Sequence, residues 1–92
     1  MIFPSYNVTF RKGAEDWIVA CGEIRNDTIK DYRLAFFRII VYGKSHTLGS
    51  GVIKIPGFRG KSTRYFEILI EGISYKLIPS IVRHEIVLES AA

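Results

Sequence analysis

The sequence is poor in cysteine and has no long hydrophobic run. Cys21 is the only cysteine among 92 residues, so neither an intrachain disulfide nor a four-cysteine zinc site can form. The segment Met1 to Lys12 has polar residues throughout and lacks the apolar run of roughly 7–15 residues that a secretion signal needs. No apolar run approaches the roughly 20 residues of a membrane-spanning helix. We therefore expect no disulfide scaffold, no export signal and no membrane span. The sequence does not indicate the cellular compartment.

The composition is that of one folded domain. Hydrophobic residues make up 48% and charged residues 24% of the chain, which is too apolar for disorder. The length leaves room for a single core, so residues 1–92 are expected to form one domain. The net charge is only +4, and most Lys and Arg residues lie within a few positions of an acid. This dispersal indicates a solvated mixed-charge surface and does not favour a nucleic-acid-binding face.

Short apolar runs separated by Gly, Pro, Asn, Asp and Ser indicate an all-β fold. Six strands are expected, at Tyr6–Phe10, Trp17–Arg25, Leu34–Tyr42, Thr47–Ile55, Ser62–Ile70 and Ile81–Glu89. Residues 72–79 fit either a seventh short strand or a 3₁₀ turn. The loops are too short for crossover helices, which predicts antiparallel pairing. Six to seven strands in this length favour an immunoglobulin-like antiparallel β-sandwich.

Alternation along these strands predicts which side chains face the core. The expected inward residues are Tyr6, Val8 and Phe10; Ile18, Ala20, Gly22 and Ile24; Ala35, Phe37, Ile39 and Val41; Phe66, Ile68 and Ile70; and Val82, His84, Ile86 and Leu88. His84 is therefore expected to be a hydrogen-bonded core histidine. The fourth strand is expected to bend near Gly49 and Gly51 and to close at Pro56-Gly57.

Three segments together resemble the FxLYD and LEA14-like group of immunoglobulin-like modules. They are Gly22-Glu23-Ile24-Arg25-Asn26, Ile39-Ile40-Val41-Tyr42-Gly43, and Pro56 to Ser62 leading to Phe66. In the second, only the tyrosine matches the family's motif strictly. The resemblance implies a non-catalytic module, often an appendage of a larger cell-envelope protein, and carries over no catalytic residue.

The residues that could perform chemistry are few and scattered. Cys21, His46 and His84 lie far apart without metal-ligand spacing, and nothing like a GxSxG motif appears. The carboxylates Glu23, Glu67 and Glu85 fall on expected outward faces. Gly49-Ser50-Gly51 lacks the lysine and the helix of a P-loop. The sequence therefore predicts no enzyme activity, no metal and no cofactor.

Large apolar side chains outside the core lines suggest an interface. They are Trp17, Val19, Phe36, Ile40, Tyr42, Tyr65 and Leu69. A contiguous exposed apolar surface marks an interaction site, here for a protein partner, a neighbouring domain or a second copy in a homodimer. Coverage of these residues by loops is the alternative. The aromatic residues Phe36, Tyr42 and Tyr65 together with Arg38 also allow a basic OB-type barrel that stacks single-stranded nucleic acid, the alternative function.

Arg59, Lys61 and Arg64 form the one local cation cluster without an acid nearby in the sequence. They follow a proline and glycine turn, and exposed loops often carry binding sites. Such a cluster could bind an acidic polymer, a phosphate or an anionic membrane surface. Its other role is to keep the turn soluble and to discourage edge-to-edge strand pairing.

Overall fold

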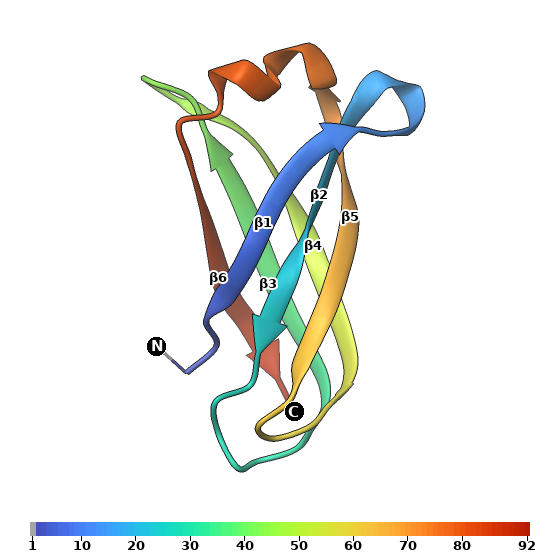
Figure 1. Ribbon diagram of the computed structural model, residues 1–92, viewed down its shortest axis with the longest axis vertical. Coiled ribbons are helices and arrows are strands. Elements are labelled where there is room, and N and C mark those ends of the chain that lie inside the picture. The colour runs from blue at the N-terminus through green and yellow to red at the C-terminus, as the bar shows by residue number, and fades with distance from the viewer. Residues whose placement is uncertain (1) are drawn as a thin grey trace.

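The computed structural model describes residues 2–92 and consists of strands with two short 3₁₀ segments (Figure 1). The strands are β1 (Ser5–Lys12), β2 (Trp17–Arg25), β3 (Tyr32–Tyr42), β4 (Thr47–Phe58), β5 (Thr63–Ser74) and β6 (Arg83–Ala91). The 3₁₀ segments are η1 (Ala14–Asp16) and η2 (Tyr75–Ser80). The ambiguous stretch 72–79 thus completes β5 and then forms the 3₁₀ turn.

The six strands form two three-stranded antiparallel sheets that pack as a sandwich. One sheet has the order β1-β2-β5 and the other β4-β3-β6. In Figure 1 the first sheet lies in front of the second. The predicted antiparallel β-sandwich is confirmed, with six strands. The sheets do not close into a barrel, so the OB-type fold behind the alternative function is wrong for this chain.

The strands β2 and β3 supply most of the core, as their alternation predicts. The inward residues of β2, Ile18, Ala20 and Ile24, are fully buried, and Gly22 is buried with them. The inward line of β3 (Ala35, Phe37, Ile39, Val41) is likewise buried. A Cβ atom on Gly22 would lie 3.0 Å from the ring of Phe66, so the glycine lets this ring pack on the β2 backbone.

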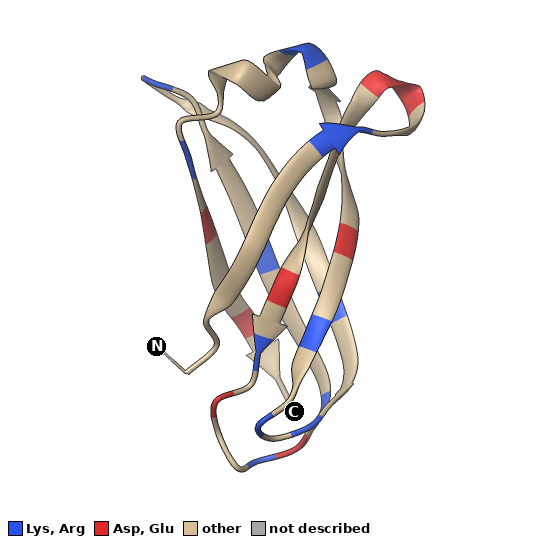
Figure 2. Cartoon of the chain, in the orientation of Figure 1, with Lys and Arg blue, Asp and Glu red and all other residues tan. Residues whose placement is uncertain are grey.

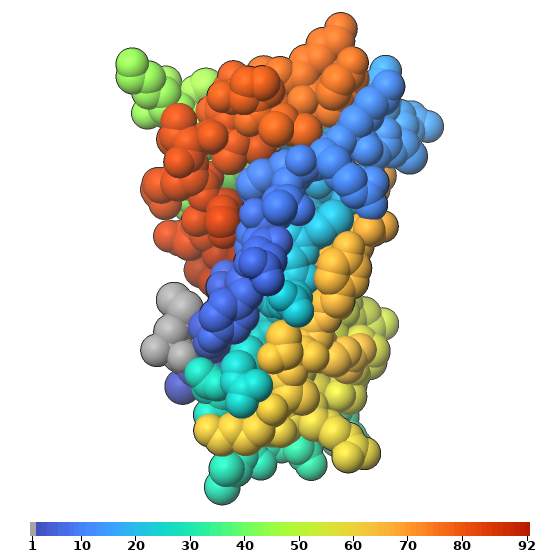
Figure 3. Space-filling model, viewed as in Figure 1, coloured from blue at the N-terminus to red at the C-terminus, as the bar shows by residue number. Residues whose placement is uncertain are grey.

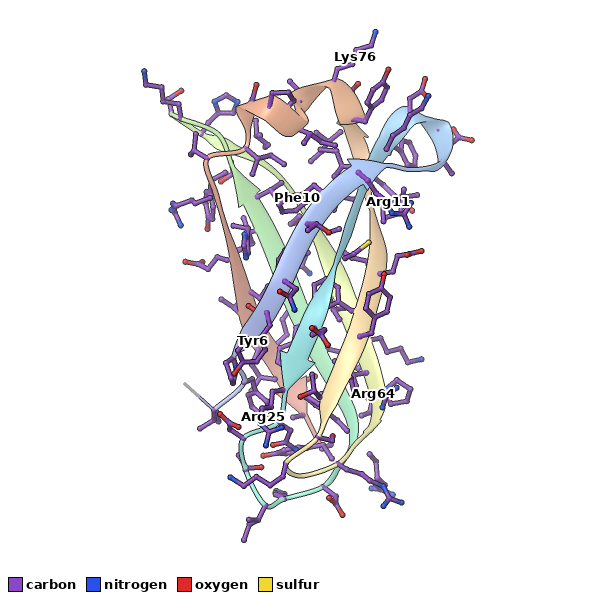
Figure 4. All side chains as sticks on the ribbon, in the orientation of Figure 1. Tyr6, Phe10, Arg11, Arg25, Arg64 and Lys76 are labelled. Carbon is purple, nitrogen blue, oxygen red and sulfur yellow. The ribbon has the colours of Figure 1, made fainter. Side chains whose placement is uncertain are left out.

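The expected burial of Tyr6 in β1 is wrong. Tyr6 is 45% exposed, whereas Val8 and Phe10 pack against the core. Asn7 has a φ of 54°, and the register with β2 shifts between Tyr6 and Thr9. A bulge of this kind changes the face on which the preceding side chain lies, which breaks the alternation. Figure 4 labels Tyr6 and Phe10 at the two ends of this strand.

The expected end of the fourth strand at Pro56-Gly57 is also wrong. β4 continues to Phe58, which is fully buried and packs against Phe3 and Phe37 at ring centroid distances of 6.0 and 6.2 Å. Pro56 is tolerated because β4 pairs with β3 alone and its other edge is unpaired. The expected irregularity near Gly49 is confirmed by a register shift opposite Val41 and Tyr42.

The expected inward line of β6 is only partly buried. His84 is exposed and its ring lies in a T-shaped arrangement with that of Phe10, with the ring centroids 5.9 Å apart, so the predicted core histidine is wrong. Val82 precedes the strand and is exposed, and Leu88 is 45% exposed. Ile86 alone of this line packs against the core. The reason is that β6 is an edge strand, which the opposite sheet covers incompletely (Figure 3).

Asn26 ties together the two loops at one end of the sandwich. Its side chain is fully buried, and its Nδ2 donates to the carbonyl oxygens of Lys30 at 2.8 Å and Phe58 at 3.3 Å. Its Oδ1 accepts from the backbone N–H of Thr28 at 3.0 Å and from its hydroxyl at 2.6 Å. Its backbone carbonyl accepts from the Lys61 amide at 2.8 Å. Asn26 therefore holds the β2–β3 loop against the β4–β5 turn.

Candidate functional site

Four of the nine residues expected to bind a partner share one surface. Phe36, Arg38, Ile40 and Tyr42 alternate along β3 and point away from the core, because their neighbours in the chain are the buried inward line. All four are half-buried. With the exposed valines Val52 on β4 and Val87 on β6, which flank Arg38 in the register, they form what we call the outer β3 face. The sequence missed these two valines, although strand alternation places both on outward positions.

Arg38 is held rigidly at the centre of the outer β3 face. Its Nε donates to Glu89 Oε2 at 3.0 Å and its Nη2 to Glu89 Oε1 at 3.4 Å. Its Nη1 donates to Ser50 Oγ on β4 at 3.3 Å. This two-pronged contact fixes the plane of the guanidinium group, so little side-chain entropy remains to be lost when a partner binds.

Tyr42 is fixed at one end of the same face. The Arg83 guanidinium lies 3.8 Å from the centre of the Tyr42 ring. The Tyr42 hydroxyl donates to Glu85 Oε1 at 3.2 Å, and Arg83 Nη1 lies 3.8 Å from Glu85 Oε2. Stacked and hydrogen-bonded in this way, the ring presents a rigid amphipathic edge, a type of side chain enriched in protein interfaces.

The apolar part of the outer β3 face is continuous but modest. Val52 and Val87 are 44% and 38% exposed, and Phe36 and Ile40 are half-buried. These four side chains surround Arg38, while Lys54 and Glu85 lie opposite Phe36 and Ile40 in the register. Apolar side chains around an arginine with a charged rim are features of protein contact surfaces.

Trp17 and Tyr65 do not belong to this face. They lie on β2 and β5 in the opposite sheet, where Trp17 is half-buried and Tyr65 is 63% exposed. Val19 is buried and packs against Gly13, where an added Cβ atom would lie only 2.3 Å from Val19 Cγ2, and Leu69 is half-buried beside it. The predicted single apolar surface is therefore divided between two sheets, and loop coverage accounts for part of it.

A polar cluster that the sequence did not indicate lies on the outer side of the β1-β2-β5 sheet. Glu67 accepts from Arg11 Nη2 at 2.7 Å and from the Tyr65 hydroxyl at 3.1 Å, and the Cys21 thiol lies 3.8 Å from it. These hydrogen bonds, the one from Arg11 first, lower the pKa of Glu67. The neighbouring Cys21, then desolvation and Glu67, raise the pKa of Tyr65 to about 12.

Arg11→Gln is expected to raise the pKa of Glu67 back toward its ordinary value, because the first cause of its lowering is removed. A carboxylate whose pKa is lowered by folding adds stability above its unfolded pKa, and this contribution is lost as the pH falls through the folded pKa. The variant should therefore lose stability at pH 7 relative to the parent and approach it in acid. Carboxyl ¹³C NMR titration measures the shift, and Lys12→Gln, whose ion pair is with Asp16, is the control. An unmoved Glu67 titration would contradict this account.

The cation cluster Arg59, Lys61 and Arg64 is less free in space than in the sequence. Arg64 Nη1 donates to the carbonyl oxygen of Pro56 at 2.7 Å, and Lys61 Nζ donates to that of Asp27 at 2.7 Å. Figure 2 shows acidic residues of the β2–β3 loop beside this turn, and Figure 4 labels Arg64 near it. Two of the three cations thus stabilise loop backbone, which leaves Arg59 as the exposed member for which no polar partner is seen among residues 2–92.

Two common marks of a metal or ligand site are absent from the described residues. No three side chains of the His, Cys, Asp and Glu types converge on a metal position within residues 2–92. Every fully buried side-chain nitrogen or oxygen in that range has a hydrogen-bond partner, so no orphaned polar atom points to a missing ligand. Within the same part of the chain, no helix is both long and apolar enough to cross a membrane.

Comparison with protein-family models, with curated proteins and with solved structures gave no match.

Proposed function

We propose that this chain is a non-catalytic protein-binding module and that the outer β3 face contacts its partner. The observation that carries the proposal is the row of Val52, Arg38 and Val87 across three strands, in which exposed apolar side chains flank an immobilised guanidinium. Rigid Arg and aromatic groups ringed by apolar contacts supply most of the energy of protein interfaces. The partner is a protein with a complementary apolar patch and a carboxylate or carbonyl that can meet Arg38 or Tyr42.

The proposal includes membership of the FxLYD and LEA14-like group, with the chain serving as an appended domain of a larger protein. Its support is the role of the residues on which the resemblance rests. Gly22 admits the Phe66 ring, Asn26 locks two loops, and Tyr42 anchors the edge of the outer face. A cell-envelope setting follows from the resemblance alone. No observation favours single-stranded nucleic acid as the partner, so that alternative is not proposed.

A photo-crosslinking experiment in the native host tests this function. A benzophenone amino acid at Val52, on the outer β3 face, is expected to give a discrete protein adduct. The same group at Tyr65, which is more exposed but lies on the opposite sheet, is the matched control and should give none. Ile40→Lys should reduce the Val52 adduct at least about tenfold, because it places a charge among the apolar anchors. Equal adducts at both positions, or none at Val52 while the protein is folded, would refute the proposal.

A further inference from the structure

The edge of β6 is unpaired and regular. Among residues 2–92, β6 pairs with β3 alone, and its register with β3 runs without interruption from Arg83 to Leu88. The first irregularity comes after Leu88, where the register shifts between Phe36 and Phe37 of β3. Six consecutive residues of extended backbone therefore face away from the sheet on one side, and such an edge is a template for another strand.

The direction of the backbone groups on this edge follows from one pair of hydrogen bonds. Leu34 and Ala92 exchange both of their backbone hydrogen bonds, with N···O distances of 3.3 and 3.0 Å. Alternate residues of a strand direct these groups to the same neighbour, so the even-numbered residues of β3 face β6. The β6 residues opposite them are Arg83, Glu85 and Val87, whose amides and carbonyls are therefore directed to β3. The amides and carbonyls of His84, Ile86 and Leu88 are therefore directed to the open edge.

The other three outer strands carry features that oppose strand addition. β1 contains the bulge at Asn7, β4 contains Pro56 and Gly57 with a φ of 59°, and β5 bends at Gly72 with a φ of 84°. Bulges, prolines and kinks are the usual protection of sheet edges. Between Arg83 and Leu88, β6 has no proline, no glycine and no positive φ.

An apolar groove runs beside this edge. It has a volume of about 260 Å³ and is lined by Ile2, Phe3, Phe37 and residues 86–88. Leu88 lies opposite the buried Phe37 yet is 45% exposed, because no strand covers it from the side. Figure 3 shows the upper part of β6 uncovered beside β1. A strand added to β6 would bring side chains over this groove and remove apolar surface from water.

We propose that a second copy of this chain occupies the edge, with the two β6 strands antiparallel about a two-fold axis at Ile86. Residues that face the core must lie opposite residues that face the core across such an axis. The pairing of the two strands can therefore shift only by two residues at a time, which moves the axis by one residue. With Ile86 opposite itself, the open-edge groups of His84 meet those of Leu88. Arg83 of each copy faces Glu89 of the other, which follows the register shift after Leu88 and also pairs with Arg38 in its own chain.

The neighbouring registers are opposed by charge. A shift of the axis to Val87 places Glu85 opposite Glu89, and a shift to Glu85 places that residue opposite its own copy. Like charges directly opposite one another destabilise a strand pair, whereas opposite charges stabilise it. The charge pattern of β6 is therefore complementary to itself with the axis at Ile86. An axis at His84 would also place Arg83 opposite Glu85, but it would pair only residues 83–85 of the strand. The dimer would hold a continuous six-stranded sheet with both outer β3 faces on the same side, so that a repetitive partner is bound bivalently.

Sedimentation equilibrium of the purified chain tests the edge. The parent protein is expected to be a dimer at micromolar concentration. His84→Pro removes an open-edge amide, leaves the β3–β6 hydrogen bonds in place, and should raise the dissociation constant at least about tenfold. His84→Ala keeps the amide and should remain dimeric, as should Ile40→Lys on the outer β3 face. A parent protein that is monomeric up to about millimolar concentration, or a folded His84→Pro variant that dimerises like the parent, would overturn the proposal.

Disulfide trapping tests the register and does not depend on the proline variant. Glu85 of one copy lies opposite Val87 of the other, as a pair without mutual hydrogen bonds whose Cα atoms are roughly 4.5 Å apart. The double variant Glu85→Cys/Val87→Cys should form a covalent dimer under mild oxidation, because this separation suits a disulfide. Each single variant should trap far more slowly. Equal trapping of the double and single variants would refute the register. Since Ile40→Lys tests the outer β3 face alone, failure of this dimer and failure of the proposed function are separable.

Discussion

Asn26→Ala is expected to lower the free energy of unfolding by about 3 kcal/mol. The substitution leaves the carbonyl oxygens of Lys30 and Phe58 without their donor and the Thr28 amide without its acceptor, in a position with no solvent access. Each buried group that loses its partner costs about 1–3 kcal/mol, and partial entry of water reduces the sum. Urea unfolding followed by circular dichroism measures the loss.

Asn26→Asp is the matched control for this prediction. It keeps the side-chain volume and the acceptor for Thr28 but turns a carboxylate oxygen toward two carbonyl oxygens. Burial and these carbonyls should raise the pKa of the new carboxyl group. A group whose pKa is raised by folding loses stability as the pH rises, so the aspartate variant should recover stability in mild acid whereas the alanine variant should not. A loss below about 1 kcal/mol for Asn26→Ala would show that the loops do not depend on this side chain.

Phe58→Ala is expected to lower the free energy of unfolding by about 4 kcal/mol. The ring is fully buried between Phe3 and Phe37, and its removal leaves a cavity at the end of the core where both loops meet. The apolar contact, the aromatic pairing and the cavity all contribute to the loss. Phe58→Leu fills most of the volume and should cost less than half as much.

Val52→Ala is the surface control on the same strand. Val52 is 44% exposed and its truncation should change the free energy of unfolding by less than about 0.5 kcal/mol. The three variants together separate the effect of burial from that of strand propensity in β4. If Phe58→Ala cost no more than Val52→Ala, the end of β4 would not be part of the core.

Strand alternation determined the sandwich and most of its core. β2 has the predicted bounds Trp17–Arg25, and the inward line of β3 is buried throughout, because a central strand has a neighbour on each side and one face against the opposite sheet. Two of the residues in the resemblance, Gly22 and Asn26, have the structural roles that their chemistry indicates: close approach of a ring and capping at a strand end. The side-chain alternation of β3 also placed Phe36, Arg38, Ile40 and Tyr42 together.

Only the tertiary structure decided the features that depend on how strands pair and on contacts between segments far apart in the sequence. Tyr6 is exposed because of the bulge at Asn7, and His84 is exposed because nothing among residues 2–92 closes the side of β6. The sequence shows Lys61 as a free cation, yet the fold brings the backbone carbonyl of Asp27 to its Nζ from 34 residues away.

The difference between what the sequence determined and what the tertiary structure decided has one physical reason. Alternation reports the two faces of a strand, which its own side chains define. Which edge of a sheet is paired, and which distant loop lies beside a given cation, depends on contacts between segments far apart in the chain. The four β3 residues of the outer β3 face could therefore be predicted from the sequence. The flanking valines, the open edge of β6 and the Asn26 contact with Phe58 required the packed sandwich.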